Sequence, residues 1–169
     1  KDKAEYSQAL KFLEMALDIN KCLKESNSYE HLSALSNIGN IWLLKEDFNK
    51  AFIYYNKAYN LLDENKIYDR STIANNIGMA LEGKKENLIA CKYYLESYKG
   101  RVKILGSKHP LTLESSYDVA KIFLKLGKEE EAIVYLEIWW MNSLEKKGGP
   151  AYELFQCYSV LNNTKEALK

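Results

Sequence analysis

The feature that most constrains this chain is a pattern that recurs along it. A small residue is followed twelve positions later by a second small residue, and a large residue stands four positions after that. The pattern occurs three times, as Gly39, Ala51 and Tyr55, as Gly78, Ala90 and Tyr94, and as Ala120, Ala132 and Leu136. Two helices approach closely where each carries a small residue, and a large side chain beside them fills the next gap. The pattern predicts helical hairpins, with Gly39 and Ala51 as the close-contact points of one of them.

The same segments carry apolar residues at every third and fourth position, which is typical of amphipathic helices. No stretch alternates between apolar and polar residues for long enough to predict a strand, so the predicted fold class is all-α. The small residue of the second helix recurs 35 to 42 residues apart, at Ala9, Ala51, Ala90, Ala132 and Ala167. Repetition at such a period predicts an array of helix pairs in which each unit packs on its neighbours.

Short polar segments, KEDFN, GKKEN and LGKEE, separate the two helices of each expected pair. Asp47 or Asn49 is expected to cap the helix that follows, because a side-chain oxygen at that position accepts a hydrogen bond from a free backbone amide. Gly83 and Gly127 are expected to adopt the left-handed conformation that ends a helix, which glycine takes without a steric penalty. These segments therefore predict tight turns inside each pair.

Composition excludes several classes of protein. The 169 residues are 47% hydrophobic and 28% charged, which is ordinary for a soluble globular protein. The apolar runs are too short for membrane insertion. The net charge is +1 with the two signs interspersed, and Arg70 and Arg101 are the sole arginines. We therefore expect no nucleic-acid partner, since such proteins concentrate basic residues and use arginine to contact phosphates and bases.

The residues that could carry chemistry do not stand at the spacing of any known site. The three cysteines are odd in number and lack metal-ligand spacing, which favours a cytoplasmic (intracellular) location and a packed core position for each of Cys22, Cys91 and Cys157. No nucleophile or carboxylate stands at a motif spacing from His31 or His109, and the His109-Pro110 pair suits the start of a helix. We expect no catalytic residues, no metal and no cofactor, and the chain is not expected to be an enzyme.

The motif LSNIGNIW (35–42) with AFIYY (51–55), ANNIGMAL (74–81) with ACKYY (90–94), and SYDVAKIF (116–123) with AIVYL (132–136) resembles the tetratricopeptide repeat family. The family's first-helix tryptophan is absent from every copy, and its terminal proline is lacking. The long repeat and the GSKHP segment at 106–110 are similar to the kinesin-light-chain-like subgroup. The resemblance implies a right-handed superhelical solenoid of antiparallel helix pairs.

On this interpretation 1–169 is one array. Its expected repeats are 1–27 (second helix only), 28–66, 67–107, 108–147 and 148–169 (partial). Because native arrays end in polar caps and neither end of this one does, we expect the sequence to be a fragment of a larger protein.

The resemblance also implies a binding surface, because first helices line the concave groove of such arrays. The positions that carry over are Ser33, Ser36, Asn37, Asn40, Thr72, Asn75, Asn76, Met79, Glu114, Tyr117, Asp118 and Lys121. Asn37 and Asn76 each precede an Ile-Gly pair, and an amide can donate and accept hydrogen bonds to a peptide backbone at once. The alternative is that these asparagines are solvated or bond within the hairpin.

The predicted function is therefore a scaffold or adaptor that binds a peptide or helix of another protein. Two alternatives stay open: a regulatory receptor that senses a short peptide, and the accessory domain of a larger enzyme. Related arrays that bind chaperone C-terminal tails clamp the carboxylate with basic residues, whereas the matching positions here are Glu114 and Asp118. Chaperone tails are therefore not expected as partners, because like charges repel.

Overall fold

The computed structural model describes residues 3–23, 28–142, 152–153 and 155–159, and these contain helices and no strand. The helices that can be given bounds are α1 (Lys3–Cys22), α2 (Tyr29–Leu44), α3 (Phe48–Asn60), α4 (Ile67–Gly83), α5 (Asn87–Leu105), α6 (Pro110–Lys125) and α7 (Glu129–Asn142). Residues 152–153 and 155–159 are also helical. Most of the last expected partial repeat, 148–169, and with it Ala167, lies outside the described residues.

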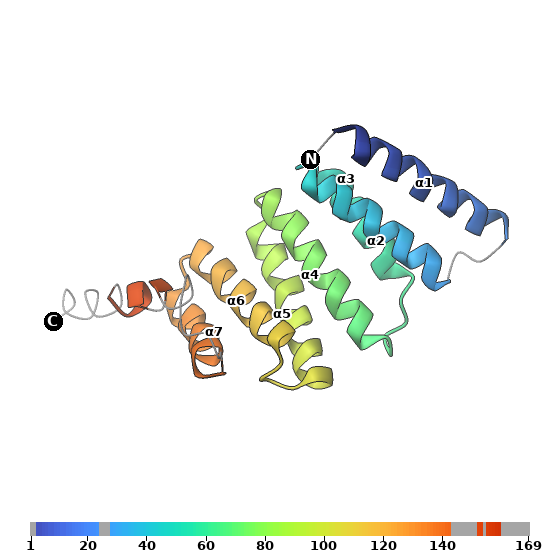
Figure 1. Cartoon of the computed structure of the whole chain (residues 1–169). Helices are drawn as coiled ribbons and strands as arrows, with labels where there is room; N and C mark the ends of the chain where they lie inside the picture. Colours follow the sequence, from blue (N-terminus) through green and yellow to red (C-terminus); the bar gives the residue numbers. More distant parts are fainter. Residues whose placement is uncertain (1–2, 24–27, 143–151, 154, 160–169) are drawn as a thin grey trace. The chain divides into compact units, whose positions relative to one another are not determined.

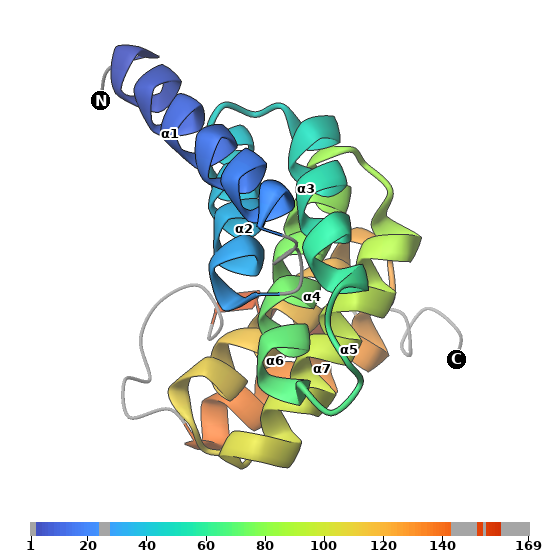
Figure 2. The same ribbon diagram turned by 90° about the vertical axis from the view of Figure 1, so that its right-hand side faces the viewer.

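The chain divides into two compact units, Lys1–Glu86 and Asn87–Lys169. In the first unit α2 contacts both α1 and α3, and α4 packs on α3 and also reaches α2 (Figure 1). Figure 2 shows the same helices after a quarter turn. In the second unit α6 packs against α5 and against α7. Each unit is thus built from consecutive helices, as the repeat pattern predicts.

Side chains cap the starts of α3 and α6. Asp47 caps α3, since its carboxylate accepts a hydrogen bond from the amide of Lys50 at 3.1 Å. That settles the choice between Asp47 and Asn49. At the start of α6, Pro110 takes the first helical position, and Nδ1 of His109 accepts from the amide of Leu111 at 3.2 Å. The structural interpretation of the His-Pro pair is confirmed.

The turns after α2, α4 and α6 share one hydrogen-bond pattern. One residue has a positive φ, and its amide donates to the carbonyl three residues back, while the next amide donates to the carbonyl five residues back. This pair of hydrogen bonds satisfies the last carbonyls of the helix. The residues with positive φ are Glu46 (58°), Lys85 (64°) and Gly127 (67°). The prediction for Gly127 is confirmed.

The prediction for Gly83 is wrong. Gly83 is the last residue of α4, and the left-handed residue of that turn is Lys85. The ring of Phe48, at the start of α3, lies where a Cβ on Gly83 would stand. Glycine is present at this position because the ring needs the space, and the turn geometry is set by the hydrogen bonds whatever residue stands there.

The hairpin of α2 and α3 is held by one close contact. The small residue Ala51 and the ring of Tyr55 are both fully buried, at 0% exposure. A Cβ on Gly39 would lie 2.6 Å from Cε1 of Tyr55, so the ring of Tyr55 is the group that packs most closely on the glycine. The Tyr55 hydroxyl also donates to Oδ1 of Asn40 at 2.7 Å. The large residue of the motif therefore covers the small one on the facing helix.

Both arginines tie neighbouring helices together. Arg70 on α4 donates to the carbonyl of Leu62 at 3.0 Å and to the hydroxyl of Tyr59, and its guanidinium lies 4.1 Å from the centre of the Tyr59 ring. Arg101 on α5 is buried and donates to the carbonyl of Leu111 at 2.9 Å. Each guanidinium therefore connects the helix that carries it to an adjoining segment of its own unit.

The cysteines do not all occupy the core. Cys91 and Cys157 are buried as predicted, and burial raises the pKa of both thiols. Cys22 is exposed, so the prediction for it is wrong. The reason is that α1 packs on α2 through the face that carries the buried Leu10 and Leu17, and Cys22 lies at the far end of the helix outside that contact.

Candidate functional site

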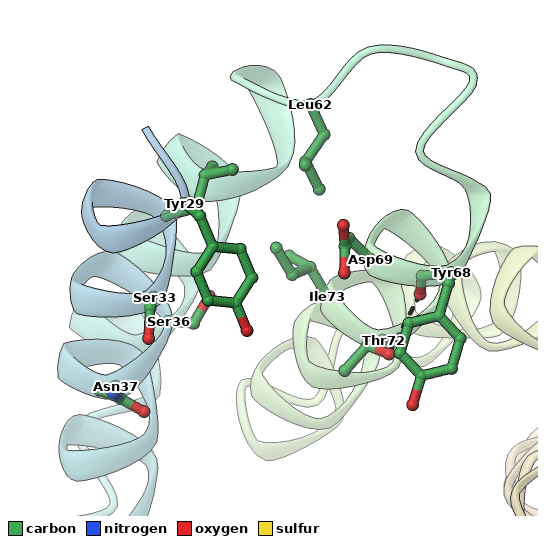
Figure 3. A pocket seen from close by; sticks show the side chains of 10 residues that line it. Tyr29, Ser33, Ser36, Asn37, Leu62, Tyr68, Asp69, Thr72 and Ile73 are labelled. Carbon is green, nitrogen blue, oxygen red and sulfur yellow. Dashed lines mark hydrogen bonds between the residues drawn. The ribbon is translucent and has the colours of Figure 1, made fainter. Parts of the chain in front are cut away.

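A pocket of about 230 Å³ opens in the first unit where α2 and α4 come together (Figure 3). We call it the α2–α4 pocket. It is lined by Tyr29, Leu32, Ser33, Ser36 and Asn37 of α2, by Tyr68, Asp69, Thr72 and Ile73 of α4, and by Leu62 of the connection before α4. The lining combines an apolar floor with hydroxyl, amide and carboxylate groups, which is the usual make-up of a binding pocket.

Four residues predicted for a binding groove line this pocket together: Ser33, Ser36, Asn37 and Thr72. The hydroxyl of Thr72 donates to the backbone carbonyl of Tyr68 at 3.1 Å. The other predicted residues of α2 and α4 do not line it: Asn40, Asn75, Asn76 and Met79. The third set, Glu114, Tyr117, Asp118 and Lys121, lies on α6 in the second unit.

The asparagines of α2 and α4 differ in what they bind. Asn37 is exposed and Asn76 is half-buried, and neither amide has a hydrogen-bond partner among the residues the structure describes. Asn40 instead accepts from the hydroxyl of Tyr55 within the hairpin. Asn75 is buried, and its Oδ1 has no partner among the described residues. Asn37 and Asn76 therefore present free amides at equivalent positions of two first helices.

The predicted residues on α6 are engaged with one another. The ammonium of Lys121 lies 2.9 Å from the Asp118 carboxylate and 4.8 Å from the centre of the Tyr117 ring. The Tyr117 hydroxyl donates to the carboxylate of Glu153 at 3.1 Å. Burial, and after it the Glu153 carboxylate, raises the pKa of Tyr117 to about 12. Of this set Glu114 is exposed and takes no part in these contacts.

The residues that the sequence analysis missed are the aromatic and acidic ones. Tyr29 and Tyr68 stand four positions before Ser33 and Thr72, one helical turn earlier on the same face. They are 74% and 46% exposed, high values for large rings. The sequence could have indicated both tyrosines, because they lie on the same helix face as the predicted groove residues, one turn nearer the start of each helix.

Asp69 carries the one formal charge on the lining of the α2–α4 pocket. None of the other lining residues is a glutamate, lysine, arginine or histidine. Asp69 is half-buried and has no ion pair or hydrogen bond within the described part of the chain. The lining of the pocket therefore has a net formal charge of −1, while the nearest arginine, Arg70, points its guanidinium at the carbonyl of Leu62 and does not itself line the pocket.

Neither histidine is placed as a catalytic base. His31 is buried at the start of α2, and its burial, followed by the nearby Lys21, lowers its pKa, so the ring is neutral at neutral pH. His109 caps α6. Within the described ranges no three His, Cys, Asp or Glu side chains gather as metal ligands would. The helices of these ranges include none that is long and apolar enough to cross a membrane.

Consecutive antiparallel helices joined by tight turns of one design define an α-helical repeat protein of the solenoid class. Residues 69–137 match the family model described as tetratricopeptide repeat. The resemblance stated from the sequence is therefore confirmed, and this stretch of the chain carries tetratricopeptide repeats. Repeats of this family are in general scaffolds for protein interaction.

Solved structures of repeat proteins show the same fold. Tetratricopeptide-like repeats attributed to a kinesin light chain from Podosopora anserina align over 98% of this chain and 83% of theirs, with a TM-score of 0.79 and 17% identity. A variant of those repeats in which one glutamine is replaced by methionine gives a TM-score of 0.79 at 16% identity, over 98% of this chain and 82% of its own. BtubC (BKLC) from P. vanneervenii aligns over 95% of this chain and 65% of its own, with a TM-score of 0.64 and 16% identity.

No curated protein sequence matches the chain. The structural likeness at such low identity concerns the fold, and the predicted all-α solenoid of tetratricopeptide type is confirmed by it.

Proposed function

We propose that this chain is a protein-interaction module that holds an extended peptide segment of a partner protein along α2 and α4. The peptide crosses the α2–α4 pocket and lies on the concave face of the array of repeats predicted from the sequence. Binding, and not catalysis, is then the activity of these residues. The partner is a protein or peptide and not a nucleic acid. The three free thiols fit a reducing compartment, which supports a cytoplasmic location.

The observation that carries this proposal is the pair of free amides at Asn37 and Asn76. Each precedes a buried Ile-Gly pair on its helix, so the two amides repeat the same position in successive first helices. A carboxamide donates through its NH₂ and accepts through its oxygen, which matches the carbonyl and N–H of a peptide bond. Two amides in this register can hold a backbone whatever side chains it carries.

The exposure of the site agrees with a peptide ligand. Asn37 lines the pocket beside the hydroxyls of Ser33 and Ser36, and these groups can satisfy further backbone polar atoms. Tyr29 presents a large exposed ring at the same site. Tyrosine is enriched in protein interfaces because it combines apolar area with a polar end.

The test is selection of a random twelve-residue peptide library on the purified chain, followed by calorimetry with a selected peptide. The double variant Asn37→Ala with Asn76→Ala should melt close to the temperature of the wild type, because neither side chain is fully buried and neither amide has a hydrogen-bond partner among the described residues. It should bind the peptide about tenfold or more weakly, since lost hydrogen bonds leave backbone groups of the ligand unpaired.

Asn49→Ala is the matched control, because Asn49 is an exposed asparagine on α3, outside the proposed site. This control should bind like the wild type. If the double variant folds and keeps full affinity, or if the library yields no binder to the wild type, the proposed function is wrong.

A further inference from the structure

We propose that the α2–α4 pocket receives the side chain of a lysine or arginine of the bound peptide. This rests on the proposed function and names the kind of peptide that the site selects. Four properties of the pocket support it: its charge, its aromatic walls, its apolar floor and its size.

The charge of the pocket comes from Asp69. Its carboxylate belongs to the first turn of α4, lines the pocket and has no cationic partner within the described residues. Figure 3 shows Asp69 and Ile73 on the α4 side of the pocket and the ring of Tyr29 on the α2 side. A carboxylate that is half-buried and unpaired attracts a cation more strongly than one in open solvent, because the local dielectric is lower. A lysine or arginine side chain would supply the missing partner with charge-assisted hydrogen bonds.

The walls of the pocket are aromatic. Tyr29 comes from α2 and Tyr68 from α4, and both rings line the cavity while being largely exposed to solvent. Ammonium and guanidinium groups are attracted to the faces of such rings. The chain already uses this contact elsewhere, since the ammonium of Lys50 lies 3.9 Å from the centre of the Trp42 ring. The tyrosines of the pocket have no cation of the chain over them among the contacts described.

The floor of the pocket suits the stem of the same side chain. Leu62 and Ile73 are both only 6% exposed and lie below the polar rim. Lysine and arginine cover apolar surface with their methylene groups while their charged ends reach a polar group. The cavity of about 230 Å³ is smaller than the pockets that enclose drug-sized ligands, which is consistent with one side chain and not a whole molecule.

The serines and the asparagine complete the arrangement. Ser33, Ser36 and Asn37 line the side of the pocket that α2 provides, so a peptide backbone held by these groups passes directly over the cavity. A side chain of that backbone can then enter between α2 and α4. Asp69 then selects the peptide side chain that enters the pocket, whereas Asn37 binds the peptide backbone.

The experiment compares the residues enriched in the random peptide library by three forms of the chain: wild type, Asp69→Asn and the control Asp63→Asn. Asp63 is exposed in the connection before α4 and does not line the pocket, so its replacement removes the same charge nearby without touching the site. Wild type and the control should enrich lysine or arginine at one position. Asp69→Asn should lose that preference while still selecting peptides.

A second experiment measures by calorimetry how tightly one selected peptide binds to each form of the chain. Its basic residue is replaced by norleucine, which keeps the apolar stem and removes the charge. Asp69→Asn should weaken binding of the basic peptide about tenfold, because a charged hydrogen bond is lost, and should change binding of the norleucine peptide less than about twofold. Tyr29→Leu, which removes an exposed ring, should also weaken the basic peptide more than the norleucine peptide.

The outcomes separate this inference from the proposed function. Selection of peptides with no basic preference, with binding still lost in the Asn37 and Asn76 double variant, overturns the inference and leaves the proposed function standing. Equal losses in Asp69→Asn and Asp63→Asn also overturn it, because the effect would then be general charge. Failure of the wild type to select any peptide removes both proposals.

Discussion

Replacement of Gly39 by alanine tests the contact that holds α2 on α3. The new Cβ would stand 2.6 Å from Cε1 and 2.7 Å from Cδ1 of Tyr55, whereas ordinary contact begins at about 3.4 Å. The ring would have to retreat by about 0.8 Å, and it is fully buried and anchored through its hydroxyl to Asn40. The substitution therefore strains the hairpin at a place where the ring has little freedom to move.

The expected magnitude is the sum of opposing effects. Alanine favours the helix over glycine by about 1 kcal/mol. Overpacking a well-filled core costs about 1 to 3 kcal/mol, and loss of the Tyr55–Asn40 hydrogen bond, should the ring shift, costs about 1 kcal/mol more. The net expectation is a loss of about 2 kcal/mol in the free energy of unfolding, with the packing cost larger than the gain in helix propensity.

Urea denaturation followed by circular dichroism measures this change, and a double variant provides the decisive comparison. In the α6–α7 hairpin the equivalent residues are Ala120 and Leu136, which share one buried cluster. The double variant Gly39→Ala with Tyr55→Leu copies that pair, so in the Tyr55→Leu background the alanine should become stabilising by up to about 1 kcal/mol. If Gly39→Ala alone raises the midpoint, or if its effect is the same in both backgrounds, the ring is not what excludes a side chain at Gly39.

Three further predictions follow from the turns, the cap and the charges. Gly127→Ala should lower stability by about 1 kcal/mol in urea denaturation, because alanine is strained at φ 67°. Lys85→Gly should leave stability unchanged or raise it by less than about 1 kcal/mol, and equal effects of the two substitutions would contradict the strain argument. Asp47 has its pKa lowered mainly by the hydrogen bond from the Lys50 amide, so its stabilising effect is present above the unfolded pKa of about 4 and is lost as the pH falls through the folded value. The difference in melting temperature between wild type and Asp47→Ala should accordingly be present at about pH 7 and shrink toward about pH 3, and a difference that grows in acid would refute this. Peptides from chaperone C-termini should show no saturable binding in calorimetry at micromolar concentration, because the positions that match the basic clamp are Glu114 and Asp118, which repel a carboxylate. Saturable binding would contradict this expectation.

The helices and their pairing could be predicted from the sequence because packing imposes a strict register. Ala51, Ala90 and Ala132 are each fully buried, as their shared position in the motif requires. The turns were less accessible to prediction. Glu46 and Lys85 adopt a conformation that favours glycine, because the pair of hydrogen bonds at the helix end outweighs the local strain. A glycine therefore marked the left-handed residue in the turn after α6, at Gly127, but not in the turns after α2 and α4.

Only part of the candidate site could be predicted, because helical periodicity does not show the contacts between helices. Helical periodicity assigns residues to a face, and this brought Ser33, Ser36, Asn37 and Thr72 to one pocket. Periodicity does not show which side chains of that face form hydrogen bonds within the protein and so cannot contact a ligand freely. Asn40 is an example. The sequence places it on the same helix face as the other predicted groove residues, but its hydrogen bond from the hydroxyl of Tyr55 forms only when α3 packs against α2.

The bonds of Arg70 to Leu62 and Tyr59 have a consequence for the energetics of binding. Leu62 belongs to the floor of the α2–α4 pocket, and its carbonyl accepts a hydrogen bond from Arg70 of α4, the residue next to Asp69. This part of the lining is thus preorganised in the unliganded chain, so a ligand need not order the segment on arrival. The conformational entropy lost on association would fall mainly on the ligand, and a conformationally restricted ligand should gain more affinity here than at a site whose walls must fold around it.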